Sequence, residues 1–546
     1  MKRIFLITWM GMVMCTGSIL ANITLPRILG HNMVLQQQKP VPVWGTAAPG
    51  EAVRVRFHGQ AKQGIADAQG HWQVWLDPMT ASSAPADLTI AGSNSIILHD
   101  ILVGEVWLCS GQSNMEYTMR KNSKVVKTDS SAASPVDELQ RANNPAIRIF
   151  LVTNKNLRAP DSLHTGWSEA RDSALRSFSA AGYFFAKELY SKLRVPIGVI
   201  SSAVPGSAIE PWMMETVRAD SSRLVSAQTG ARHGPLLVVD STRPGKFVPT
   251  MVAPLALFAL RGFLWYQGET NCFQNERFEY TEKMELLIRG WRRLWRDTAL
   301  PFYYVGIAPF YYSRTKNQYP LTEETLPRFW TAQYEVMRRV PHTGMVVTTD
   351  LVRTPDDLHP GFKWEIGRRL AQWALANEYG MKVTPSGPVV RQVLYVKGTV
   401  ELVYTGIGKG LISRDGRPLN WFSLRGANGK WLPAQARIDG NKVYVSSADL
   451  PEPTAVRFGW NEAAQPNLFN KDGLPAMPFL HESRSARELL DQLPSIKSVE
   501  DIPHRQTSDP EPEDSHVDEH AKQHHSLSEE AGGSIRPGNR VAAYAL

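Results

Sequence analysis

The chain has 546 residues, of which 43% are hydrophobic and 21% are charged. These values are close to globular averages and exclude a wholly disordered or fibrous protein. The net charge is +8, but residues 491–546 hold 11 acidic and only 5 basic side chains, so the positive charge belongs to the preceding body. The densest basic cluster, between Arg289 and Arg296, alternates with apolar residues as on an amphipathic helix. We therefore expect no nucleic-acid partner.

The first 21 residues have the pattern of a secretory signal peptide. Lys2 and Arg3 precede an apolar run from Ile4 to about Val13, and small residues lead to a cleavage position after Ala21. This run is shorter than the ~20 residues that a membrane-spanning helix needs, and no later segment reaches that length. We expect the protein to be exported, either to the periplasm or by secretion, without a membrane span.

Two cysteines, Cys109 and Cys272, remain after the predicted cleavage position. Two cysteines exclude a disulfide-rich framework. A single bridge between them in an oxidising compartment and a pair of small buried thiols both stay open.

Residues 22–98 alternate short apolar runs with Gly and Pro turn signals. Val53–Phe57, for example, follows Pro49 and Gly50 and is followed by His58 and Gly59. Short strands at this spacing predict an N-terminal β-sandwich domain.

Residues 99–382 change to strands that alternate with helices. The predicted strands are Val103–Cys109, Ile147–Val152, Ile197–Ala203, Gly262–Tyr266, Tyr303–Ile307 and Met345–Thr349. The predicted helices are Ser179–Lys192, Tyr280–Trp295, Leu326–Arg338 and Pro360–Glu378. This alternation indicates an α/β domain whose mostly parallel sheet is covered on both faces.

Residues 383–488 return to short strands, and residues 489–546 are polar, acidic and poor in aromatics. The strands predicted for this second β-domain are Val389–Val396, Val400–Tyr404, Trp431–Ile438, Lys442–Ser446 and Ala455–Trp460. The composition of residues 489–546 predicts a disordered tail.

Polar segments follow four strands of the predicted parallel sheet. They are Ser110–Met115, Val204–Trp212, Gln267–Asn271 and Asp356–Pro360. Ligands of open α/β sheets bind outside the carboxyl ends of the strands. Four such segments at one sheet edge predict a binding or catalytic site there.

Three segments resemble the sialate O-acetylesterase family of the SGNH hydrolase superfamily. They are Gly111–Met115, Trp265–Asn271 and Asp357–Pro360. The resemblance extends over roughly residues 22–480. It implies a three-layer α/β/α, flavodoxin-like catalytic domain at residues 99–382, flanked by β-sandwich-like domains.

By this resemblance, Ser113 is the nucleophile and His359 is the general base that takes its proton. The superfamily usually has a carboxylate three residues before the histidine, whereas the nearest relatives often have it two residues before. Both Asp356 and Asp357 are acidic here, and we favour Asp357 as the group that orients the imidazole.

The resemblance also implies an oxyanion hole made by the N–H groups of Ser113 and Gly206 and by one side-chain amide. The superfamily usually has Asn two residues after the glycine of the third segment, where this chain has Thr270. The amide donor therefore stays open between Asn271 and Gln267.

The remaining polar residues of these segments, Glu210, Trp212 and Glu269, are candidates for sugar contacts or for support of the loops. The implied chemistry needs no metal and no organic cofactor. We expect a serine esterase that hydrolyses O-acetyl esters of sialoglycans through an acetyl-enzyme. The alternatives are a deacetylase of acetylxylan, pectin or another acetylated glycan, and a carbohydrate-binding surface protein without catalysis.

Overall fold

The computed structural model describes residues 22–127, 134–152, 166–214 and 243–483. The predicted signal peptide (residues 1–21) and the predicted tail (489–546) lie outside these residues. None of the described helices is both long and apolar enough to cross a membrane.

The N-terminal part is built from strands that pair antiparallel, apart from the first, Val34–Gln36, which pairs in parallel with the last. Its strands are β1 (Val34–Gln36), β2 (Val41–Thr46), β3 (Ala52–Phe57), β4 (Gln60–Ile65), β5 (His71–Leu76), β6 (Ser82–Ala91) and β7 (Ser95–Gly111). β2 pairs with β5, while β3 pairs with β4 and β6, and β6 pairs with β7. In β3, Val53, Val55 and Phe57 are buried and the residues between them are exposed, as expected for a strand with one face on the core.

Strand β7 connects the N-terminal sheet to the central sheet. Its first half pairs antiparallel with β6, and its second half pairs in parallel with strands of the central sheet. From Ile101 to Gly111 every residue is buried, because this half is covered on both faces. The strand runs without a break through residues 98 and 99, where the sequence predicted a domain boundary.

The central sheet has the strand order β13-β12-β11-β7-β10-β8-β9. Its other strands are β8 (Ile147–Leu151), β9 (Ser168–Glu169), β10 (Ile197–Ala203), β11 (Gly262–Tyr266), β12 (Phe302–Val305) and β13 (Thr343–Val346). All neighbours along this order pair in parallel except β9, which is antiparallel to β8. The predicted mostly parallel sheet is confirmed.

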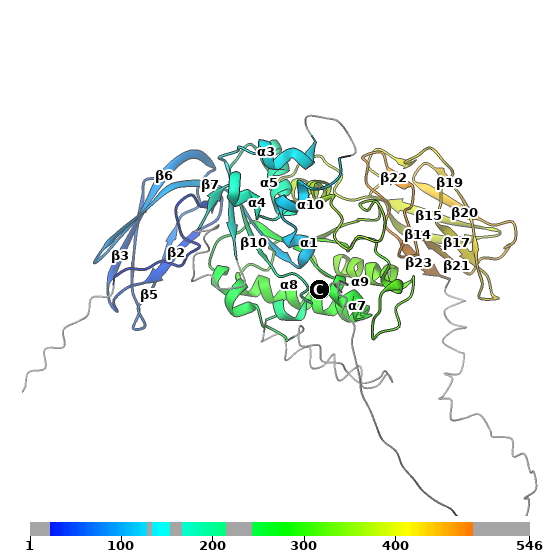
Figure 1. The fold of residues 1–546 in the computed structure, drawn as a ribbon, viewed down its shortest axis with the longest axis horizontal. Helices are drawn as coiled ribbons and strands as arrows, with labels where there is room; N and C mark the ends of the chain where they lie inside the picture. The colour runs from blue at the N-terminus through cyan, green and yellow to red at the C-terminus, as the bar shows by residue number, and fades with distance from the viewer. Residues whose placement is uncertain (1–21, 128–133, 153–165, 215–242, 484–546) are drawn as a thin grey trace, which may run out of the picture. The chain divides into compact units, whose positions relative to one another are not determined.

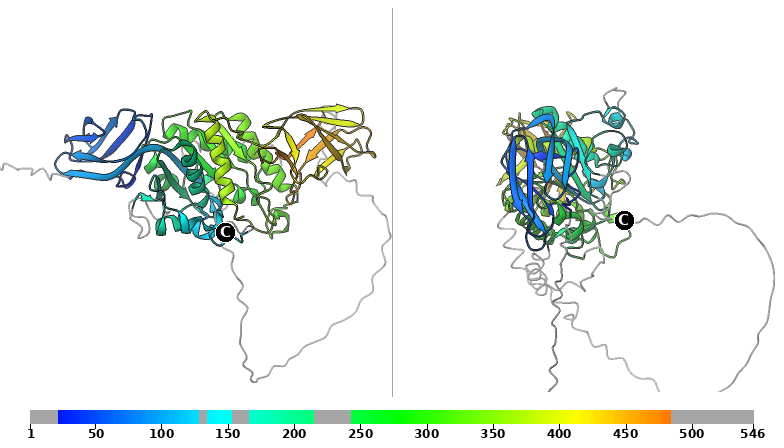
Figure 2. Two further views of the ribbon diagram at one scale, coloured as in Figure 1. Left: turned by 90° about the horizontal axis from the view of Figure 1, so that it is seen from above. Right: turned by 90° about the vertical axis from the view of Figure 1, so that its left-hand side faces the viewer.

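Four long helices cover the two faces of this sheet (Figures 1 and 2). Helices α5 (Ala180–Leu193) and α10 (Lys363–Asn377) pack into one core cluster, and α8 (Phe278–Leu294) and α9 (Thr325–Arg339) pack into the other. At Gly367 of α10 a Cβ atom would lie 2.6 Å from the backbone nitrogen of Phe185, so the absence of a side chain lets the first two helices approach closely. The short helices are α1 (Ser113–Glu116), α2 (Met119–Asn122), α3 (Glu138–Arg141), α4 (Asp172–Arg176) and α7 (Glu269–Phe273).

The C-terminal part of the described chain is all β. Its strands are β14 (Val389–Val396), β15 (Thr399–Thr405), β16 (Leu411–Ser413), β17 (Phe422–Arg425), β18 (Trp431–Pro433), β19 (Gln435–Asp439), β20 (Lys442–Ser446), β21 (Ala455–Phe458), β22 (Leu468–Asn470) and β23 (Phe479–Glu482). They form two four-stranded antiparallel sheets, β14-β15-β20-β19 and β18-β17-β21-β23, and the short pair β16-β22. Side chains of both four-stranded sheets share one hydrophobic core.

The single strand predicted for Trp431–Ile438 was wrong. The segment forms two strands, β18 and β19, which belong to different sheets. Pro433 has no N–H to donate, and the next N–H, that of Ala434, donates to the carbonyl of Phe422. The chain leaves the first sheet after Ala434, whose N–H makes this bond to β17, and enters the other sheet at Gln435.

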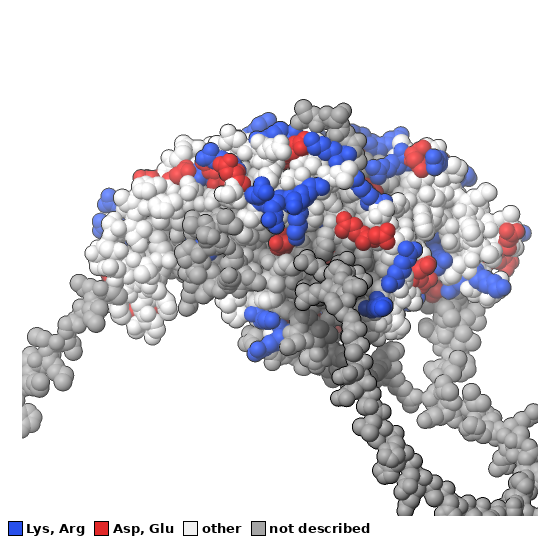
Figure 3. All heavy atoms as spheres, viewed as in Figure 1, with Lys and Arg blue, Asp and Glu red and all other residues white. Residues whose placement is uncertain are grey.

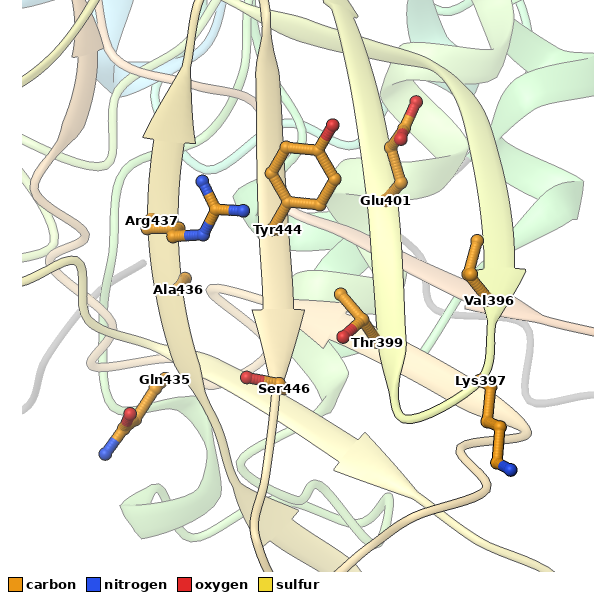
Figure 4. Close-up of a pocket in the computed structure, with 9 residues that line it drawn as sticks. All are labelled: Val396, Lys397, Thr399, Glu401, Gln435, Ala436, Arg437, Tyr444 and Ser446. Carbon is orange, nitrogen blue, oxygen red and sulfur yellow. The ribbon is translucent and has the colours of Figure 1, made fainter.

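The surface carries mixed charge and one hollow remote from the predicted site residues. On the face in Figure 3, acidic side chains are interspersed among the more numerous basic ones. The hollow, of about 390 Å³, lies on the β14-β15-β20-β19 sheet, where the guanidinium of Arg437 stacks 4.4 Å from the ring centre of Tyr444 (Figure 4). All the residues that line it belong to the C-terminal β part.

Candidate active site

Three of the predicted segments leave the central sheet at the same level. Gly111 at the end of β7 is the register partner of Ala203 in β10 and of Tyr266 in β11. The segments that follow these three adjacent strands therefore begin side by side, at the carboxyl edge where such sheets bind ligands.

The turn that presents Ser113 depends on Gly111. This glycine has φ of 138°, and a Cβ atom there would lie only 2.1 Å from the carbonyl oxygen of Tyr266. Only glycine fits such a close approach. Two residues later the chain enters α1, whose first residue is Ser113.

His359 reaches the serine from the far edge of the sheet. It lies in the segment between β13 and α10, and its Nε2 is 2.8 Å from the Oγ of Ser113. Burial lowers the pKa of His359, the positive charge of Lys363 lowers it further, and the charge of Asp357 opposes both. A pKa below the usual value keeps the imidazole neutral at pH 7, the form that can accept a proton from Ser113.

Of the two candidate acids, Asp357 is the one bonded to the histidine segment. Its Oδ1 accepts a hydrogen bond of 2.8 Å from the backbone N–H of His359, and its charge raises the pKa of the imidazole. Both Asp356 and Asp357 are exposed. Within the described residues neither carboxylate is hydrogen-bonded to the imidazole ring.

Two backbone N–H groups are available for an oxyanion. In the described part of the chain, the N–H groups of Ser113 and Gly206 take part in no hydrogen bond. Gly206 has φ of 71°, and its carbonyl accepts a hydrogen bond of 3.2 Å from the hydroxyl of Thr270. Thr270, which stands where the superfamily usually has Asn, therefore holds the loop of Gly206.

The two predicted amide donors are both occupied inside the protein. The Nε2 of Gln267 donates to the Oδ1 of Asn271 at 2.7 Å, and its Oε1 accepts from the hydroxyl of Tyr280 at 2.9 Å. The Nδ2 of Asn271 donates to the Oε1 of Glu276 at 3.1 Å. In this arrangement the two amides stabilise the segment Gln267–Asn271.

A third amide, which sequence reasoning missed, lies beside the serine. The Oε1 of Gln112 accepts a hydrogen bond of 3.1 Å from the Nε2 of Gln267, and this bond orients the Gln112 amide. The Nε2 of Gln112 has no hydrogen-bond partner among the described residues. The feature of the sequence that could have identified Gln112 as a donor is its position directly before Ser113.

A model of the family "carbohydrate esterase, sialic acid-specific acetylesterase" matches residues 103–376, which is half of the chain. The chain belongs to this family. The sialate O-acetylesterases of Mus musculus and Homo sapiens are both 27% identical to it, over 514 and 497 residues. These alignments cover 83% of this chain and 93% and 91% of the two relatives. A crystal structure of a carbohydrate acetylesterase from Xanthomonas citri is 33% identical, with a TM-score of 0.73, and the match covers 84% of this chain and 100% of that one.

Membership of this esterase family makes the protein a carboxylic ester hydrolase, and it places the segments described above within the matched range. The side chains of Trp212 and Glu269, which were candidates for sugar contacts, are buried. The indole N–H of Trp212 donates to the hydroxyl of Ser207 at 3.0 Å, and Glu269 accepts a hydrogen bond from Asn114. These contacts favour loop support over a sugar contact for both.

The third candidate for a sugar contact in this carbohydrate esterase, Glu210, is only partly buried. Its Oε1 accepts from the ammonium group of Lys283 at 2.6 Å, and that ammonium is also 2.7 Å from Glu276. Burial raises the pKa of Glu276 to about 7, against the effect of the lysine. Glu210 therefore closes a polar network between its own loop and α8.

A groove of about 490 Å³ lies between the start of α10 and the C-terminal β part of the esterase, and neither Ser113 nor His359 is among the residues that line it. One wall comes from the start of α10, where the half-buried rings of Phe362 and Trp364 meet edge to face at 5.4 Å. The charged residues that line it are Arg369, Arg414, Lys471, Asp350 and Glu365. The groove therefore combines aromatic rings with one more basic than acidic side chain.

Cys109 and Cys272 of this carbohydrate esterase are both free and buried, so they are thiols and the alternative of a disulfide between them was wrong. Burial raises the pKa of each thiol. Over the described ranges, no group of three or more His, Cys, Asp or Glu side chains is placed to hold a metal ion.

Proposed function

We propose that this protein hydrolyses O-acetyl esters of sialic acids through an acetyl-enzyme on Ser113. The observation that carries the proposal is the 2.8 Å separation between the Oγ of Ser113 and the Nε2 of His359. A nucleophile within hydrogen-bond reach of a neutral base is what acyl transfer to serine requires.

In the first half of the reaction, His359 takes the proton of the Ser113 hydroxyl while Oγ attacks the carbonyl carbon of the acetyl group. The negative charge that develops on the carbonyl oxygen is stabilised by the N–H groups of Ser113 and Gly206 and by the amide of Gln112. Collapse of the tetrahedral intermediate breaks the bond to the sugar oxygen, which takes the proton from His359 and leaves as the sugar hydroxyl.

In the second half, His359 removes a proton from water, and the resulting hydroxide attacks the acetyl-enzyme. Acetate leaves and the proton returns to Ser113. The charge of Asp357 stabilises the imidazolium that forms in each half.

The groove at the start of α10, lined by Phe362 three residues after His359, supports an acidic sugar as substrate. Phe362 and Trp364 offer apolar faces to a sugar ring. Arg369 and Arg414 are ion-paired with Asp350 and Glu365, and the remaining basic side chain, that of Lys471, suits the carboxylate of a sialic acid. Two relatives are sialate O-acetylesterases. The pattern of residues 1–21 supports action outside the cytoplasm, in the periplasm or after secretion.

The test is release of acetate from O-acetylated sialylated mucin and from acetylated xylan, measured side by side by mass spectrometry. We expect faster release from the mucin, and none above background with Ser113→Ala. Faster release from xylan would assign the site to a neutral glycan, and release by Ser113→Ala equal to wild type would remove the serine from the mechanism. No release from any ester would leave only a carbohydrate-binding protein.

A further inference from the structure

A buried polar cluster lies behind the candidate catalytic pair. It consists of Asn114, Lys363 and Glu269, which are 0%, 0% and 1% exposed. We call these three residues the Asn114 cluster. Asn114 follows Ser113 in the chain, and Lys363, the first residue of α10, lies four residues after His359.

The cluster bonds three separate segments through a single side-chain amide. The Nδ2 of Asn114 donates to Glu269, which opens α7, and to the carbonyl of Leu358 at 3.0 Å. The Oδ1 of Asn114 accepts from the Nζ of Lys363 at 2.8 Å, and the same Nζ donates to the carbonyl of Pro360 at 2.7 Å. Leu358 and Pro360 flank the histidine, so the carbonyl on one side of it is bonded directly to Asn114 and the carbonyl on the other side is linked to Asn114 through Lys363.

The ammonium of Lys363 is enclosed by aromatic rings. It lies 4.8 Å from the ring centre of Tyr117 and 5.2 Å from that of Tyr266, distances at which a cation is attracted to a ring face. Burial lowers the pKa of Lys363 to about 7, against the attraction of nearby carboxylates. The charged and ionisable groups that face this site are Glu269, Asp357, Lys121, Tyr117, Tyr266 and His359.

Burying a lysine and a carboxyl group costs free energy unless hydrogen bonds compensate. Asn114 supplies one hydrogen bond to each, while the Oε2 of Glu269 has no partner among the described residues and burial raises the pKa of this carboxyl group. An apolar trio would fill the same space without that cost. The bonds to the backbone on either side of His359 give the polar trio a task that apolar residues could not perform.

We propose that the Asn114 cluster is a positioning device that holds the imidazole of His359 at hydrogen-bond distance from Ser113. The proposal rests on the proposed function, because it assumes that these two residues react. None of the three cluster residues touches the reacting atoms, so each acts through the backbone of the histidine segment.

The first test replaces the ammonium with an apolar chain of similar length, Lys363→Met. We expect kcat for p-nitrophenyl acetate to fall about 10- to 100-fold while KM changes by less than about two-fold, because a displacement of the order of 1 Å is enough for such a loss. The acid limb of the pH profile should also move to higher pH, since a cation near His359 has been removed.

The control is Arg148→Met, which removes another buried cation, paired at 2.8 Å with Asp100 and placed on β8 outside the candidate site. This variant should lower the melting temperature but leave kcat within about two-fold of wild type. If Lys363→Met lowers the melting temperature in the same way and keeps the wild-type kcat, the cluster is only structural and the proposal fails.

A second pair of variants tests the proposal if Lys363→Met does not fold. Glu269→Gln retains an oxygen that accepts from Asn114, whereas Glu269→Leu does not. We expect kcat within about three-fold of wild type for the first and a loss of about 10- to 100-fold for the second. Equal kcat values for the two would overturn the proposal. A wild-type enzyme that releases no acetate would instead contradict the proposed function.

Discussion

The variant Asp357→Asn separates two contributions of the favoured acid, its negative charge and its hydrogen bond to the backbone of His359. The carboxylate accepts the backbone N–H of His359 at 2.8 Å, and the Oδ1 of an asparagine can accept the same bond. The variant therefore keeps the shape of the loop and removes only the negative charge beside the imidazole. The matched control, Asp356→Asn, removes an equally exposed charge one residue earlier, which has no hydrogen bond to the histidine segment among the described residues.

The expected loss follows from the exposure of Asp357. Unit charges about 4 Å apart interact by about 1 kcal/mol in water and about 4 kcal/mol at the effective dielectric constant of a protein surface. For an exposed carboxylate we expect about 1–3 kcal/mol of lost imidazolium stabilisation, which is about 5- to 150-fold in kcat/KM. A buried triad aspartate, by comparison, is worth about 10⁴-fold.

The assay is the pH dependence of kcat/KM for p-nitrophenyl acetate with both variants. Asp357 raises the pKa of His359, so its loss should move the acid limb to lower pH, while Asp356→Asn should leave both the rate and the limb within about two-fold of wild type. The reverse ranking of the two variants would assign the role to Asp356. An unchanged rate and limb in Asp357→Asn would refute the electrostatic argument altogether.

Two further predictions concern the oxyanion and the base. Gln112→Leu should lower kcat about 10²- to 10³-fold with little change in KM, as the loss of one oxyanion donor does. The control, Asn271→Leu, should instead mainly lower the melting temperature. A larger loss of kcat in Asn271→Leu than in Gln112→Leu would assign the donor role to Asn271. The acid limb of the wild-type kcat/KM should lie below the ordinary pKa of a histidine, because burial lowers the pKa of His359 and the imidazole must be neutral to act as base. An acid limb centred above pH 7 would mean that the imidazole is not buried as in this structure.

Local sequence patterns located six of the seven strands of the central sheet, whereas β9 was not predicted and β13 begins at Thr343 instead of Met345. The strands Ile197–Ala203 and Gly262–Tyr266 have the predicted bounds, because each is an apolar run closed by turn residues and fully enclosed by helices. The same pattern failed at Trp431–Ile438, where one proline divides an apolar run between two sheets. Helix α10 starts at Lys363 instead of Pro360, since the carbonyl of Pro360 accepts a side-chain ammonium.

From the sequence, the candidate site could be predicted only for residues that belong to the motifs shared with the family. Ser113 and His359 could be paired from the resemblance, although 246 positions separate them in the chain. The hydrogen bond of the Asn271 amide could not be predicted, because its partner Glu276 is a partly buried carboxylate whose position depends on the fold of the segment between α7 and α8. Lys363 likewise reads as a surface residue at the start of a helix, since lysine is almost never fully buried, and only the fold shows it enclosed.

The most direct measurement of the central claim is capture of the acetyl group on the enzyme. The wild-type protein is mixed with p-nitrophenyl acetate, quenched with acid within the first turnover, digested and analysed by mass spectrometry. The account predicts one added acetyl group on the peptide that contains Ser113, assigned to that side chain by fragmentation, and none in Ser113→Ala. An acetyl group on another residue, or turnover by Ser113→Ala at the wild-type rate, would contradict it.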